Sequence, residues 1–117
     1  ESNSSPNCGW STQNKASNCA WLASLAAAAN ASLPGRVGIY SSVHMWTEIM
    51  SDTPTGCTSG TGMPLWYPHY ESPPEPNFND FSPFGGWQTP SIKQYSGTGS
   101  LCGASVDENW APAPPPM

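Results

Sequence analysis

The sequence predicts a small α/β fold stabilised by disulfides, and three observations support this prediction. An alanine-rich stretch near the N-terminus carries apolar residues at helical spacing, whereas several later segments are short, apolar and rich in β-branched or aromatic residues. The elements are predicted in the order helix, strand, helical turn, strand, long loop, strand, strand. Four cysteines in a chain of 117 residues further indicate a small domain stabilised by disulfides.

The N-terminal half contains the predicted helix, which spans about 12–31. Its apolar residues at helical spacing are Ala20, Leu22, Leu25 and Ala28. The segment Leu33-Pro34-Gly35 ends the helix, and the apolar run 36–41 then predicts a buried strand. Ser42 is a candidate N-cap for one or two helical turns before Pro54.

The C-terminal half is predicted to contain strands and a long loop. Residues 63–70 are apolar and aromatic, but two prolines confine this strand to a sheet edge or make its ends irregular. The loop 71–90 should be ordered, because its three phenylalanines and one tryptophan argue against disorder. A strand is expected over 92–96, closed by the glycine-rich segment 97–99, and a last strand through Ser105-Val106-Asp107.

Composition excludes several classes of function. The net charge is −5, and Lys15, Arg36 and Lys93 are scattered, so no nucleic acid is expected as a partner. No apolar run approaches the roughly 20 residues of a membrane span. No phosphate loop, serine elbow or zinc signature occurs, and neither His44 nor His69 has a carboxylate or cysteine at ligand spacing. We therefore expect no cofactor and no metal, and assign both histidines to polar loops or surfaces.

Disulfides are expected among four cysteines, namely Cys8, Cys19, Cys57 and Cys102. The absence of a Cys-x-x-Cys pair argues against a thioredoxin-type site and against a zinc ribbon. Of the three possible connectivities, Cys8–Cys19 with Cys57–Cys102 is favoured, because the first pair flanks one short segment.

The domain is predicted to cover residues 1–110, followed by a proline-rich tail or linker over 111–117. Asn3 and Asn30 each begin an N-glycosylation sequon. An even number of cysteines in a short chain rich in Trp, Pro and Ser is typical of secreted domains, and the sequons have a meaning only in a secretory pathway. We therefore expect a secreted or extracellular protein, or one of a lysosomal or phagosomal lumen.

Five segments, in this order, resemble glycoside hydrolase family 25, in particular the lysozyme-like proteins of nematodes and protists: Val37-Gly38-Ile39-Tyr40-Ser41-Ser42, Pro64-Leu65-Trp66-Tyr67-Pro68-His69-Tyr70, Phe81-Ser82-Pro83-Phe84-Gly85-Gly86-Trp87, Ile92-Lys93-Gln94-Tyr95 and Gly103-Ala104-Ser105-Val106-Asp107. The resemblance implies a secreted muramidase that cleaves β-1,4 bonds of bacterial peptidoglycan and folds as a modified (β/α) TIM-like barrel. It covers roughly Trp21 to Trp110 and corresponds to the C-terminal part of that barrel.

The resemblance also assigns the acidic residues. Asp107 matches the acidic residue near the last strand of the family, where it would help to position or polarise substrate. The central Asp-x-Glu motif has no match, although Glu1 falls about where its glutamate would lie. One carboxylate is not enough for glycoside hydrolysis. The remaining acidic candidates are expected on solvated surfaces: Glu48, Glu71, Glu75, Asp80 and Glu108.

Aromatic residues near the proposed strand ends are candidates for glycan binding, because flat rings stack on sugar faces and phenols bond hydroxyl groups. They are Tyr40, Trp66, Tyr67, Tyr70 and Tyr95, of which Tyr40 and Trp66 are favoured. Buried packing explains the same residues almost as well.

Two hypotheses for function follow. In the first, the chain is the C-terminal half of a muramidase that acts on peptidoglycan when joined to the N-terminal half. In the second, it is a non-catalytic extracellular module that binds glycans or assembles with itself. In either case a half-barrel leaves bare sheet edges, so the missing half or a second copy is the expected partner.

Overall fold

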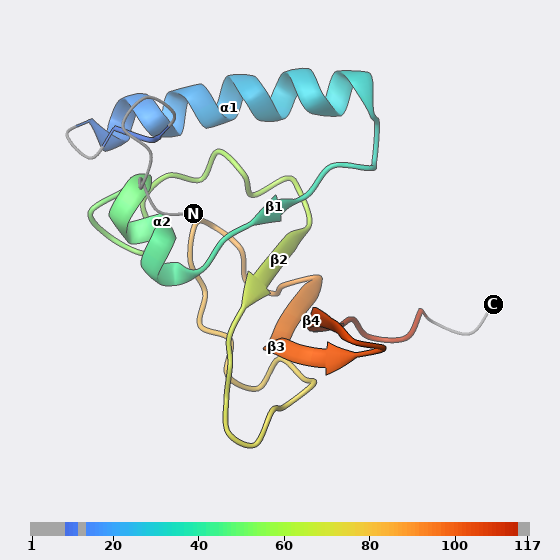
Figure 1. Cartoon of the computed structure of the whole chain (residues 1–117). Helices are drawn as coiled ribbons and strands as arrows, with labels where there is room; N and C mark the ends of the chain where they lie inside the picture. The colour runs from blue at the N-terminus through green and yellow to red at the C-terminus, as the bar shows by residue number, and fades with distance from the viewer. Residues whose placement is uncertain (1–8, 12–13, 115–117) are drawn as a thin grey trace.

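The computed structural model describes residues 9–11 and 14–114. These residues form α1 (Lys15–Ser32), β1 (Ile39–Tyr40), α2 (Val43–Ile49), β2 (Leu65–Pro68), β3 (Ile92–Leu101) and β4 (Ala104–Trp110) (Figure 1). The predicted α/β class and element order are confirmed. No helix in the described part of the chain is both long and apolar enough to cross a membrane.

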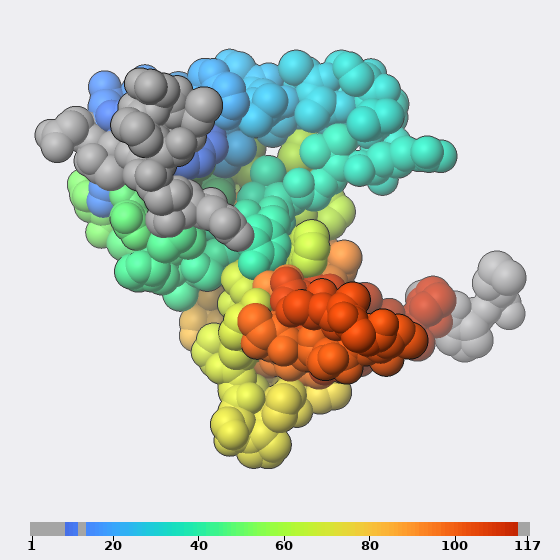
Figure 2. Space-filling model, viewed as in Figure 1, coloured from blue at the N-terminus to red at the C-terminus, as the bar shows by residue number. Residues whose placement is uncertain are grey.

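Helix α1 lies across one end of the molecule, the loop between β2 and β3 (yellow) reaches the other end, and the β3–β4 hairpin lies between them (Figures 1 and 2). The helix starts at Asn14, whose side chain accepts a hydrogen bond from the Ser17 amide at 3.0 Å. Its buried residues are Asn18, Leu22 and Ala26. Leu25 is 45 % exposed, because only this narrow i, i+4 stripe packs against the rest of the molecule.

The four strands form one sheet in the order β1-β2-β3-β4. β1, β2 and β3 are parallel to one another, and β4 returns antiparallel to β3. The β3–β4 turn uses Cys102 and Gly103, whose φ angles of 51° and 77° suit a tight two-residue hairpin. In this strand order β2 lies between β1 and β3, so it is an inner strand. Its two prolines lie at its ends: Pro64 directly before the strand and Pro68 as its last residue.

The two faces of the sheet differ in burial. Along β2, Leu65 and Tyr67 are buried while Trp66 is 36 % exposed. Because side chains alternate across a strand, Trp66 lies on the face opposite the core. We call this the open face. The core on the other face joins residues of both helices, β2 and the loop 71–90: Leu22, Trp46, Ile49, Met50, Leu65, Tyr67, Phe84 and Trp87.

The loop 71–90 is ordered as predicted, because it contributes two core aromatics. Phe84 and Trp87 are 2 % and 4 % exposed, and the Trp87 indole donates to the Met63 carbonyl at 2.8 Å. Gly85 and Gly86 between them have φ angles of 57° and 91°, which favour glycine. This turn folds both rings into the core.

The observed disulfide joins Cys19 on α1 to Cys57 in the loop before β2. The predicted connectivity is therefore wrong on both counts: Cys19 does not pair with Cys8, and Cys102 is an exposed free thiol rather than the partner of Cys57. Cys8 itself lies outside the described residues. The bridge links the helix to the core-bearing loops, a contact between segments that spacing along the chain does not reveal.

Candidate functional site

A polar and aromatic cluster lies at the carboxyl ends of β1 and β2, where Gln94 of β3 is level with Pro68, the last residue of β2. Tyr40 is the last residue of β1, Tyr70 follows β2 by two residues, Gln94 lies on β3 and Asp107 on β4. The carboxyl ends of parallel strands share one sheet edge, which is where ligands bind in open α/β sheets. We call these four residues the Gln94 cluster.

Gln94 is the centre of the cluster and is only 6 % exposed. Its Oε1 accepts hydrogen bonds from the Tyr40 hydroxyl at 2.9 Å and the Tyr70 hydroxyl at 2.6 Å. Its Nε2 donates to Asp107 Oδ2 at 3.0 Å. Asp107 Oδ1 accepts a further hydrogen bond from the Thr98 amide at 3.2 Å. The carboxylate is thus held in one orientation at an exposed position.

Trp66 extends this cluster across the open face. Its ring contacts Tyr40 edge to face, with centroids 4.8 Å apart, and its Nε1 donates to Asn109 Oδ1 at 2.8 Å. Both its ring and that of Tyr70, which is 55 % exposed, present apolar surface to solvent beside fixed polar groups. Exposed rings next to oriented donors and acceptors suit a ligand with both flat apolar faces and hydroxyl groups, as a sugar has.

Sequence reasoning identified most of this cluster. It named Tyr40, Trp66, Tyr70 and Asp107, which the structure brings together, although their part in glycan binding remains a prediction. No hydrogen bond joins Tyr95 to the cluster within the described ranges. Glu1 and Asn3 lie outside the described residues. Asn30 is exposed in the last turn of α1.

Gln94 was missed, although it connects the other residues. The available signal was its place beside Lys93 in a predicted strand. Neighbouring side chains of a strand point to opposite faces, so two adjacent polar residues in an inner strand each need a hydrogen-bond partner on their own face. The sequence alone gave no partner for either of them.

Lys93 lies on the core side of the sheet in a second, ionic cluster. Its side chain is fully buried, and Nζ donates to Asp80 Oδ1 at 2.7 Å and to Glu71 Oε2 at 3.4 Å. The Tyr67 hydroxyl donates to the same Asp80 oxygen at 2.9 Å. His69 Nδ1 contacts Asp80 Oδ2 and lies 3.8 Å from Glu71 Oε1. We call His69, Glu71 and Asp80, with Lys93, the Asp80 cluster.

The expectation that Asp80 is a solvated surface residue is wrong, because its side chain is only 10 % exposed. Burial by itself raises the pKa of Asp80, but the hydrogen bonds from Lys93 and Tyr67 outweigh it and hold that pKa below its usual value. Burial, followed by the hydrogen bond to Asp80, raises the pKa of the Tyr67 hydroxyl well above its usual range. The cluster is therefore ionised around Asp80 at neutral pH, with Tyr67 as a neutral donor.

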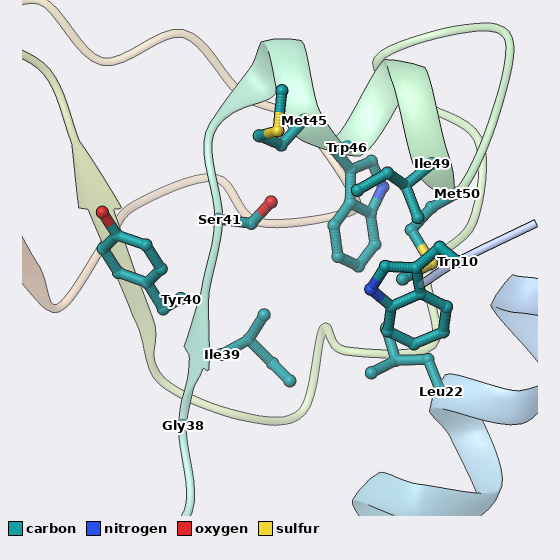
Figure 3. Close-up of a pocket in the computed structure, with 10 residues that line it drawn as sticks. All are labelled: Trp10, Leu22, Gly38, Ile39, Tyr40, Ser41, Met45, Trp46, Ile49 and Met50. Carbon is teal, nitrogen blue, oxygen red and sulfur yellow. The ribbon is translucent and has the colours of Figure 1, made fainter. Parts of the chain in front are cut away.

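An apolar cavity of about 180 Å³ lies between α1, α2 and β1 (Figure 3). Trp10, Leu22 and Trp46 surround it, while the Tyr40 ring projects to the other side of β1. The described residues that line it include no carboxylate and no imidazole, so it offers no acid or base. The acidic groups of the described site residues lie instead in the Gln94 cluster and the Asp80 cluster.

Fold and site together define an α/β protein with an aromatic, polar cluster at the strand ends, where ligands bind in α/β folds. The family model described as lysozyme-like protein 1 matches residues 4–95. This chain belongs to that lysozyme-like family, which includes the family 25 lysozymes.

Curated relatives agree with this assignment. The chain is 45 % identical over 103 residues to probable GH family 25 lysozyme 2 of Dictyostelium discoideum, covering 88 % of this chain and 44 % of that protein. It is 38 % identical to lysozyme-like protein 5 of Caenorhabditis elegans, over 83 % of this chain and 43 % of the relative. Counting factor 45-1 of D. discoideum is 45 % identical over 63 % of this chain and 23 % of its own length. The chain thus spans less than half the length of these relatives, and no solved structure matches it.

Proposed function

We propose that this chain forms the C-terminal part of a secreted lysozyme-like glycoside hydrolase that cleaves β-1,4 bonds in peptidoglycan. The observation that carries the proposal is the Gln94 cluster, which fixes two phenols, an amide and a carboxylate beside the carboxyl ends of β1 and β2. Family membership and the relatives named as family 25 lysozymes support the same activity.

The sheet is part of a (β/α) TIM-like barrel in this proposal. β1 is at one end of the sheet, with a single neighbouring strand among the described residues. A backbone edge left open in this way is a site for further strand pairing. The rest of the family domain, or a second copy of this chain, covers that edge and completes the cleft over the open face.

The chemistry divides between this chain and the rest of the domain. Hydrolysis of a glycosidic bond needs an acid to protonate the leaving oxygen and a second carboxylate or an acetamido group to stabilise the developing positive charge. Asp107 is the only carboxylate of the Gln94 cluster, and its hydrogen bonds from Gln94 and Thr98 suit a residue that positions or polarises substrate. The acid comes from the Asp-x-Glu segment of the family, for which Glu1 is the candidate position.

Localisation outside the cytosol is part of this proposal. The Cys19–Cys57 disulfide supports an oxidising compartment, because such bonds persist outside the cytosol. The sequon at Asn30 is on an exposed helix end, where a glycan can be accommodated. Secretion and a lysosomal or phagosomal lumen both satisfy these features.

A second candidate function is a non-catalytic module that binds glycans without cleaving them. The specific observation in its favour is that the Gln94 cluster contains one carboxylate, although catalysis requires a pair of acidic groups or help from the substrate. The aromatic surface of Trp66 and Tyr70 serves either function equally well.

Two measurements separate these functions, both made on this chain joined to the N-terminal half that carries the Asp-x-Glu motif: sedimentation with insoluble peptidoglycan, and release of reducing ends. We expect binding, and expect Trp66→Ala to weaken it about fivefold, since one aromatic contact contributes about 1 kcal/mol. The control is Trp21→Ala, because Trp21 is an exposed tryptophan on α1 that contacts Trp10 rather than the cluster.

Release of reducing ends that disappears in Asp107→Asn supports the hydrolase. Binding with no release supports the non-catalytic module. If neither binding nor release is found, or if Trp21→Ala weakens binding as much as Trp66→Ala, the open face is not a glycan site.

A further inference from the structure

The Asp80 cluster brings together three side chains that are separated in the sequence. His69 directly follows β2, while Glu71 and Asp80 lie in the loop that leads to β3. One possible ligand atom from each lies within 4.8 Å of the other two. One imidazole nitrogen and two carboxylate oxygens thus converge on a common point.

Lys93 determines which oxygens face that point. Its Nζ holds Asp80 Oδ1 at 2.7 Å and Glu71 Oε2 at 3.4 Å. The other two oxygens, Asp80 Oδ2 and Glu71 Oε1, are those nearest His69 Nδ1. By binding one oxygen of each carboxylate, Lys93 orients the other oxygen toward His69. The outer-shell partners of metal ligands commonly orient the ligands in this way.

An independent observation concerns the inner oxygen of Asp80. Oδ2 is inaccessible to solvent and accepts no hydrogen bond, although its side chain is nine-tenths buried. A buried acceptor left without a donor costs about 1–3 kcal/mol, and more when it is charged. His69 Nδ1 makes no hydrogen bond to this atom and is a positive partner only when the imidazole is protonated. Beside a neutral imidazole, the oxygen lacks the positive partner that a buried carboxylate requires.

We propose that His69 Nδ1, Glu71 Oε1 and Asp80 Oδ2 form a binding site for a divalent transition-metal ion, with Zn²⁺ as the ion that fits the donors. Zinc accepts mixed nitrogen and oxygen ligands in a site with few of them, whereas Ca²⁺ takes about 6–8 oxygen ligands. The proposal is independent of peptidoglycan binding.

Charge and geometry both favour this ion. Two carboxylates and one lysine leave a net charge of −1, which attracts a cation beside the oxygens that Lys93 does not use. In a tetrahedral site with bonds of about 2.1 Å, ligand atoms lie about 3.4 Å apart. The Glu71–His69 separation of 3.8 Å is close to this value, and the shorter His69–Asp80 contact has to open. The His69 side chain is 51 % exposed, so its ring has room to move and solvent can supply a fourth ligand.

The ion would fasten the loop 71–90 to the end of β2. Lys93 is a positioning residue in this site, because it touches the carboxylates and not the bound ion.

The test is calorimetric titration of Zn²⁺ into the metal-free full chain. All proteins carry Cys8→Ser and Cys102→Ser, because a thiolate is itself a zinc ligand. We expect saturable binding of a single ion per chain, weaker by about tenfold or more in His69→Ala, since losing a ligand costs at least as much as losing an outer-shell partner. Glu71→Gln is the second variant and is expected to weaken zinc binding in the same way.

The matched control is His44→Ala. His44 is the other histidine of the chain, with a side chain 79 % exposed. Among the described residues its ion-pair contact is with one carboxylate, Glu48, one helical turn away. Unchanged zinc affinity in this variant and a loss in His69→Ala support the site. The proposal is overturned if the folded parent protein shows no saturable zinc binding, or if His69→Ala binds zinc as tightly as the parent. In either case the cluster is only an ion-pair network.

Discussion

Replacing Lys93 by methionine should destabilise the protein more than any exposed charge substitution. The Lys93 side chain is completely buried and 2.7 Å from Asp80, whose side chain is 10 % exposed. Methionine fills similar space but leaves the Asp80 carboxylate with only the Tyr67 hydroxyl as a donor to Oδ1. Breaking a buried ion pair on one side costs about 3–5 kcal/mol.

That loss is a large fraction of the stability of a small domain, which is about 5–15 kcal/mol. Urea unfolding followed by tryptophan fluorescence measures it. With a urea dependence of about 2 kcal/mol per molar, the midpoint should fall by about 2 M. Adding Asp80→Asn to Lys93→Met should recover part of the loss, because the amide can still accept from Tyr67 without an unpaired charge.

Lys15→Met is the matched control. Lys15 also lies 2.7 Å from an aspartate, but Asp52 is 89 % exposed, so the expected loss is about 1 kcal/mol or less. Equal midpoints for Lys93→Met and Lys15→Met would refute the reasoning, because burial would then make no difference to the two ion pairs. The reasoning would also be refuted if the Lys93→Met/Asp80→Asn double variant were less stable than Lys93→Met alone.

Three further predictions follow from the fold. Replacing both Cys19 and Cys57 by alanine should lower the free energy of unfolding by about 4 kcal/mol in the chain-entropy model, because 38 residues separate the two cysteines. Differential scanning calorimetry, with the Cys102→Ser variant as the reference, checks this prediction. Gly85→Ala should cost about 2 kcal/mol or more in urea, because its Cβ would lie 2.7 Å from the Trp87 ring at a φ of 57°, whereas Gly62→Ala meets nothing within 4 Å and should be nearly neutral. Light scattering after gel filtration should show self-association of the isolated chain through its open sheet edge; a monodisperse monomer that melts cooperatively would contradict this.

The helices were largely predictable because their ends are encoded locally. Ser42 was identified as an N-cap, and its hydroxyl does accept from the Met45 amide at 3.1 Å. The Leu33-Pro34-Gly35 segment likewise marked the end of α1. Capping depends on residues three or four apart, so one sequence is enough to detect it.

The sheet was less predictable where tertiary contacts override local preference. β3 was expected to stop at Gly97 but runs to Leu101. A Cβ at Gly97 would lie 2.9 Å from the Tyr70 hydroxyl, so glycine is there because a side chain of another segment approaches the backbone. The glycine was a sign of close packing within the strand and not of its end.

Burial of charge was the main feature that the sequence did not reveal. Asp80 was assigned to solvent because it lies in a loop, yet the flanking Phe78 and Phe81 pack against the core and draw the loop inward. The disulfide pairing failed for a similar reason, since Cys19 and Cys57 meet only after α1 docks on the loop before β2. Both depend on long-range packing that spacing does not encode.

The most direct test of the central claim is a titration of the ¹⁵N-labelled chain with soluble peptidoglycan fragments, followed by amide chemical shifts. The account predicts saturable shifts at Tyr40, Trp66, Gln94, Thr98 and Asp107, with little change along α1. Absence of saturable shifts, or shifts confined to the apolar cavity between α1 and α2, would contradict a glycan site at the carboxyl ends of the strands.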